Sequence, residues 1–188
     1  MVAIALAGNV WSRKILPPLE TLLGITHLLF LPITVIVLVV MAPHSSNSFV
    51  WATTTTGLSG WTNPGVQWCI GLLTPAFTLV SIDGVIHMSN EVHDPARKVP
   101  KSMIWSILIN GALAFLMVIT LLYTIGDPEA ALTSTTGYPI IQIFYQATGS
   151  KAGTVVLTSM IIWAGMGSMF GSFASVTRLT CQYLLFYP

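Results

Sequence analysis

The sequence predicts an all-α membrane protein with four transmembrane helices. Of its 188 residues, 54% are hydrophobic and only 7% are charged, whereas an ordinary soluble domain carries about 25% charged residues. A soluble fold of this size would expose large apolar surfaces to water and aggregate, whereas lipid solvates such surfaces directly. Membrane strands are excluded because the alternating segments of roughly ten residues that a barrel requires are absent.

Four stretches are long and apolar enough to cross a bilayer, which takes roughly 20 residues of helix. They are residues 22–41, 65–90, 102–125 and 153–177. The first contains His27, and the second contains Asp83 and His87. The third and fourth contain no acidic or basic side chain, so the second span is predicted to carry most of the chemistry.

Basic residues predict the orientation, because short cytoplasmic loops are rich in Lys and Arg. Six of the seven basic residues fall in loops 11–21 and 91–101 or directly after the fourth span, and only Lys151 falls on the other side. Loops 42–64 and 126–152 are therefore predicted to face outward. Within the second outer loop, apolar residues 138–147 are too few to span, so they are predicted to form a helix that lies on or dips into the outer face.

The second span is predicted to be interrupted near residues 80–84. A carboxylate such as Asp83 is costly inside a bilayer unless it is paired or hydrated. Gly84 weakens a helix, and Ser81 and Asp83 compete for backbone hydrogen bonds. Backbone groups freed by a break are tolerated only where they line a protein-enclosed cavity, and many secondary transporters build substrate sites in this way. The alternative is an unbroken helix whose Asp83 bonds to a neighbouring span.

Residues 81–100, SIDGVIHMSNEVHDPARKVP, resemble the sixth helix and following loop of amino-acid/polyamine/choline (APC) superfamily permeases. That family's pattern is close to G-F-D…EE-V-x-N-P-x-R-x-[IV]-P. The matching residues are Asp83, Glu91, Val92, Pro95, Arg97, Val99 and Pro100. The surrounding sequence is most similar to fungal choline and 4-aminobutyrate permeases. The resemblance covers residues 11–180 and implies helices five to eight of a twelve-helix transporter.

The resemblance implies the inverted-repeat fold of the bacterial leucine transporter, with a discontinuous second span. It implies a secondary transporter of amino acids or related amines, such as choline or 4-aminobutyrate, in a plasma or internal membrane. Freed carbonyls attract a cationic head and half-helix N-termini attract a carboxylate, which suits such substrates. The residues that would face the substrate by resemblance are Phe77, Thr78, Val80, Ser81, Ile82 and Asp83.

The sequence also departs from the family pattern. Ser81-Ile82 replace the usual Gly-Phe, which removes an aromatic side chain at position 82, and Asn90 leaves Glu91 as the remaining acid of a pair. The chain begins after the helix that completes the family's substrate site, and residues 181–188 depart from the family's next loop. Residues 1–188 are therefore expected to be a single partial transporter domain that does not transport alone.

His27 and His87 are the candidates for proton coupling. By resemblance, His27 lies near the position of a lysine found in proton-coupled relatives. His87 shares one helix face with Asp83 and Glu91, because these residues recur every four positions, and such a stripe can relay protons. The alternatives are a His27 bonded to a neighbouring helix and a Glu91 paired with Arg97. By resemblance, Glu91 and Arg97 belong to the loop that contacts the inner gate.

The fourth span carries small residues along one face. They are Ala164, Gly167, Ser168, Gly171, Ser172 and Ser175. Close helix packing is the favoured interpretation. The alternative, which comes from the resemblance, is that the serine hydroxyls contribute to a cation site.

Other classes of function are disfavoured. A net charge of +1 without a basic run argues against nucleic-acid binding. No metal or cofactor is predicted, because His87, Glu91 and His93 lack a typical ligand spacing. An enzyme is not predicted, because the third and fourth spans offer no ionisable partner for Asp83. The competing function is a non-transporting membrane protein that associates with other membrane proteins.

Overall fold

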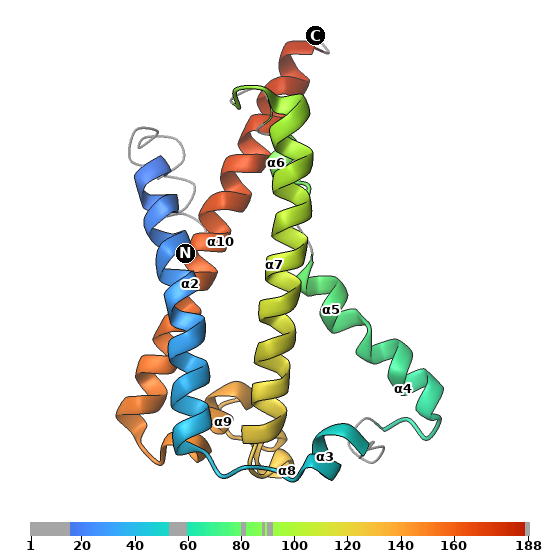
Figure 1. The fold of residues 1–188 in the computed structure, drawn as a ribbon, viewed down its shortest axis with the longest axis vertical. Helices are drawn as coiled ribbons and strands as arrows, with labels where there is room; N and C mark the ends of the chain where they lie inside the picture. The colour runs from blue at the N-terminus through green and yellow to red at the C-terminus, as the bar shows by residue number, and fades with distance from the viewer. Residues whose placement is uncertain (1–15, 53–59, 80–81, 88, 90–91, 187–188) are drawn as a thin grey trace.

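The computed structural model describes residues 16–52, 60–79, 82–87, 89 and 92–186, and these residues form helices and connecting loops without a strand. The helices are α2 (Leu16–Met41), α3 (Asn47–Ala52), α4 (Pro64–Gly71), α5 (Leu73–Thr78), α6 (Gly84–His87), α7 (Pro95–Thr124), α8 (Pro128–Leu132), α9 (Pro139–Thr148) and α10 (Lys151–Phe186). Figure 1 shows α2, α7 and α10 as the long elements of the molecule. The prediction of an all-α protein is confirmed.

Three helices in the described part of the chain are long and apolar enough to cross a membrane. They lie within Pro17–Met41, Pro95–Thr124 and Lys151–Thr180. Most of their large apolar side chains are exposed, for example Val40 at 75% and Phe115 at 64%. Such surfaces require lipid or further protein around them, so the chain is an integral, multi-pass membrane protein.

The second predicted span, residues 65–90, is divided into the short helices α4, α5 and α6 rather than forming one continuous helix. Figure 1 shows α4 and α5 running away from the long helices, whereas α6 lies beside α10 and α7. The discontinuity that the sequence predicts for this segment is therefore present, and none of its described pieces reaches spanning length.

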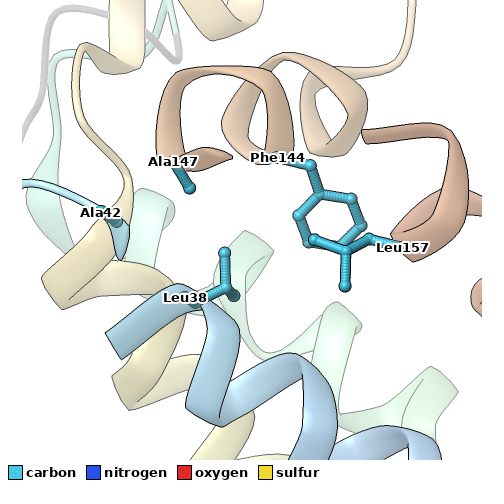
Figure 2. Close-up of a cluster of buried hydrophobic side chains, with 5 residues drawn as sticks. All are labelled: Leu38, Ala42, Phe144, Ala147 and Leu157. Carbon is cyan, nitrogen blue, oxygen red and sulfur yellow. The ribbon is translucent and has the colours of Figure 1, made fainter. Parts of the chain in front are cut away.

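The main apolar cluster joins four helices at the end of the molecule where α2 ends. Its buried members are Leu38, Ala42, Phe144, Ala147 and Leu157. Figure 2 shows the Phe144 ring of α9 beside Leu157 of α10, with Leu38 of α2 facing them. Met117 and Leu121 of α7 pack against this cluster. The helix that the sequence predicts over residues 138–147 is thus present as α9, and its apolar side holds it to α2 and α10.

A tight turn connects the end of α7 to α8. Gly126 has a φ of +68°, a conformation that side-chain-bearing residues rarely adopt. The Asp127 amide donates to the Gln146 Oε1 at 3.1 Å, and the Gln146 Nε2 donates to the Asp127 carbonyl at 3.4 Å. The Asp127 carboxylate also accepts the first amides of α8. These bonds tie the turn to α9.

A second set of hydrogen bonds ties α3 to the end of α7. The Trp51 Nε1 donates to the Tyr123 hydroxyl at 3.1 Å, and that hydroxyl donates to the Asn47 Oδ1 at 2.9 Å. The Ser45 amide donates to the Tyr123 carbonyl at 2.7 Å. Tyr123 therefore fixes the start of the first predicted outer loop.

The helices α2 and α10 approach each other closely at Gly167. A Cβ added there would lie 3.2 Å from the Leu23 Cβ, which is tighter than ordinary van der Waals contact. Nearby, the Trp163 Nε1 donates to the Thr26 Oγ1 at 2.9 Å. At Gly167, the small-residue face of α10 serves close helix packing.

Candidate functional site

The interruption between α5 and α6 is the place where the structure departs most clearly from a regular membrane helix. The C-cap of α5 is Leu79, with φ −100° and ψ 4°. Ile82 and Asp83 form a turn directly before α6. The Ile86 amide of α6 donates a hydrogen bond to the Asp83 carbonyl at 2.8 Å. Two predicted substrate-facing residues, Val80 and Ser81, lie outside the described residues.

Asp83 and His87 lie together at this interruption, as their spacing predicts. The His87 Nε2 is 3.6 Å from the Asp83 Oδ2, and the two side chains are 27% and 67% exposed. The contact is an ion pair only if His87 carries a proton. The carboxylate thus remains open on one side to a cationic group. Glu91, the third member of the predicted stripe, lies outside the described residues.

The other predicted substrate residues are only partly placed. Phe77 lies on α5 and is 69% exposed, so the described structure leaves its ring free of the long helices. Thr78 is the last residue of α5, and the structure describes its backbone but not its side chain. Ile82 is half-buried beside Asp83.

The remaining predicted residues lie away from Asp83 in sequence and on other elements. His27 is exposed on α2, next to the Thr26 hydroxyl that accepts the Trp163 hydrogen bond. Arg97 is exposed in the first turn of α7. Its predicted partner, Glu91, lies outside the described residues.

α10 reaches the interruption through a residue whose contact the sequence did not reveal. The Ser175 hydroxyl is buried and donates to the Gly84 carbonyl of α6 at 3.4 Å. Ser168 and Ser172, the other serines of the same stripe, are exposed. The sequence signal was the small-residue face of α10, but it did not say which hydroxyl meets which helix.

Two further features of the described residues bear on binding. Within those residues no group of three or more His, Cys, Asp and Glu side chains is placed to hold a metal ion. A shallow pocket lies along α4 and the start of α5, with Val66, Cys69 and Leu73 among its lining residues. Figure 1 shows α4 well separated from α6, so this pocket is distinct from the surroundings of Asp83.

Comparisons with known proteins point to one family. The model of the amino acid permease family matches residues 1–183. A choline transporter from Saccharomyces cerevisiae is 34% identical over 162 residues, which cover 86% of this chain and 29% of the yeast protein. From the same yeast, a GABA-specific permease is 36% identical over 96 residues, covering 50% of this chain and 17% of that protein.

A third relative, the 7-keto 8-aminopelargonic acid transporter of Saccharomyces cerevisiae, is 34% identical over 116 residues, covering 61% of this chain and 20% of that protein. The chain therefore spans less than a third of the length of these relatives. No solved structure matches the chain.

Proposed function

The chain belongs to the amino acid permease family, and we propose that it forms part of a secondary transporter that moves amino acids or related amines, such as choline or 4-aminobutyrate, across a membrane. The observation that carries the proposal is the interruption between α5 and α6, with Asp83 directly before α6. An ionisable side chain and an irregular backbone inside a membrane segment are both characteristic of transport sites.

The chemistry of the interruption suits a substrate with a positively charged amine. The Asp83 side chain is 67% exposed, so its carboxylate has room for a second partner beside His87. Backbone carbonyls at an interrupted helix add partial negative charge. The proposed substrate-facing set is Phe77, Thr78, Val80, Ser81, Ile82 and Asp83. The names of the relatives, which include choline and GABA carriers, support an amine or amino-acid substrate.

Proton coupling through His87 is part of the proposal. The imidazole lies 3.6 Å from the Asp83 carboxylate, so a protonated His87 and a cationic substrate compete for the same carboxylate. Loss of the proton frees Asp83 for the substrate, and its return favours release. His27, on the exposed side of α2, is the second candidate and has no comparable neighbour among the described acidic groups.

The test exchanges the matched 162 residues of the yeast choline transporter for those of this chain and measures uptake of labelled choline and 4-aminobutyrate. Asp83→Ala should lower uptake about tenfold or more at an unchanged amount of surface protein, because a hydrogen bond to a charged group contributes about 1.5–3 kcal/mol. Asp94→Asn, which removes the charge of an exposed acid just before α7 and tolerates the positive φ of that position, is the control.

The same exchange protein tests the coupling. His87→Gln should flatten the dependence of uptake on external pH, and His27→Gln should leave it in place. Normal uptake by Asp83→Ala would remove Asp83 from the mechanism, and an unchanged pH dependence in His87→Gln would remove the proposed coupling.

A non-transporting membrane protein that associates with other membrane proteins is the second candidate. Its support is the apolar surface of α4 and α5, where Trp68 and Phe77 are each 69% exposed. Co-purification with a permease from membranes in which the exchange protein shows no uptake would favour this function.

A further inference from the structure

Ser175 differs from several hydroxyl residues of α10 in the group that accepts its hydrogen bond. Ser159, Thr177 and Thr180 each donate to the carbonyl four residues earlier in α10, over 2.7, 2.7 and 2.9 Å. Ser175 instead donates to the carbonyl of Gly84, 91 positions away in the sequence. A hydroxyl that can bond within its own helix but bonds to another one connects the two elements.

The contact between Ser175 and Gly84 is buried and close. Ser175 is 9% exposed and its neighbour Ala174 is 3% exposed. A Cβ added to Gly84 would lie 3.7 Å from the Ser175 Oγ, which is ordinary van der Waals contact, so even the smallest side chain at position 84 would meet α10. Because a buried hydroxyl needs a partner, loss of the bond to the Gly84 carbonyl would leave Ser175 to bond within α10, and the link between the two helices would be lost.

This hydrogen bond lies in α6, the part of the interrupted segment that packs against the long helices. α6 packs on both α10 and α7, whereas α4 and α5 pack chiefly on each other. Figure 1 shows the same contrast, with α6 inside the group of long helices and α5 leading away from it. The Gly84 carbonyl belongs to the residue that directly follows Asp83, so a bond to it constrains the backbone that bears the carboxylate.

We propose that Ser175 is a positioning residue for Asp83. By holding the Gly84 carbonyl, it fixes the first turn of α6 against α10 and thereby the direction in which the Asp83 carboxylate points. The hydrogen bond from the Ile86 amide to the Asp83 carbonyl, at 2.8 Å, transmits the constraint along the same turn. The importance of Asp83 for a substrate rests on the proposed function, whereas the contact itself does not.

Cysteine cross-linking of the 188-residue chain in membranes tests the contact. Cys69 and Cys181 are first replaced by serine, and then Gly84→Cys is combined with Ser175→Cys. A copper–phenanthroline oxidant should join this pair, because a Cβ at position 84 would lie 3.7 Å from the γ atom of residue 175 and a disulfide forms only between side chains that approach this closely. The control combines Gly84→Cys with Thr177→Cys, whose side chain points about 200° away around the helix and should react about tenfold more slowly or not at all. Equal cross-linking of the two pairs would overturn the proposal.

Thiol labelling tests the positioning. In the chain with Asp83→Cys and Cys181→Ser, a water-soluble maleimide labels position 83, and the exposed Cys69 serves as an internal control. Ser175→Ala should raise the labelling rate at position 83 about fivefold, which corresponds to the loss of one hydrogen bond. Ser175→Thr, which retains the hydroxyl, should keep the original rate.

The control at Cys69 separates positioning from general unfolding, which would raise labelling at both cysteines. An unchanged rate at position 83 in Ser175→Ala, or an equal rise in Ser175→Thr, would overturn the inference. Normal uptake by Asp83→Ala in the exchange protein would instead remove Asp83 from the proposed substrate site, so the two failures are distinguishable.

Discussion

Phe144 offers the most direct test of how the end of the molecule that contains α9 is held together. Its side chain is fully buried in the cluster between α9, α2 and α10. A phenyl ring removes about 150–250 Å² from solvent, which at about 25 cal/mol per Å² is worth about 4–6 kcal/mol. Since alanine retains a small part of this area, Phe144→Ala should lower the free energy of unfolding by about 3–5 kcal/mol.

In the assay, the 188-residue chain in lipid nanodiscs is heated to a series of temperatures. The fraction of protein that remains monodisperse after each heating gives the unfolding midpoint. A loss of about 3–5 kcal/mol corresponds to a drop of roughly 6–20 °C in the midpoint for a chain of this size. Tyr145→Ala is the matched control, because the neighbouring ring is 42% exposed and its removal should cost less than about 1 kcal/mol. Equal midpoints for the two variants would refute the reasoning, since α9 would then not depend on its buried face.

Two glycines give the remaining predictions. Gly126→Ala should destabilise the turn before α8 by about 1–2 kcal/mol and speed its proteolysis, because its φ is +68° and a new Cβ would lie 2.5 Å from the Gln146 Oε1; an unchanged cleavage rate would contradict this. Gly167→Val should cost about 1–3 kcal/mol through overpacking against Leu23, whereas Gly165→Val, with no atom within 4 Å of its Cβ position, should leave the unfolding midpoint almost unchanged. Equal losses at the two positions would argue against close packing of α2 on α10.

The class of fold was predictable because a protein can accommodate a long apolar run in few ways, chiefly as a membrane-spanning helix. Residues 22–41 and 153–177 each lie inside a helix of spanning length, and residues 102–125 do so except for the last, Ile125. The helices nevertheless extend further, with α7 beginning at Pro95 and α2 at Leu16. Hydropathy marks the part of a helix that suits lipid, whereas polar residues can continue the same helix into water. Proline at the first helical position, as at Pro95, supports such an extension.

In the candidate site, only contacts between residues that lie close together in the sequence were predictable. The spacing of Asp83 and His87 placed both side chains on one helical face, and they lie 3.6 Å apart. The contact of Ser175 with Gly84 was not predictable, because it depends on how two distant helices are rotated against each other. A stripe of small residues indicates which face packs closely but does not identify the partner.

The measurement that tests the central claim most directly is a cysteine scan across the interruption, at positions 77, 79, 82 and 83, in the exchange protein inserted in membranes. A water-soluble thiol reagent should label positions 82 and 83, and choline or 4-aminobutyrate should slow that labelling. Resistance of all four positions to the water-soluble reagent, with labelling only by a lipid-soluble one, would show a continuous lipid-facing helix and contradict the account.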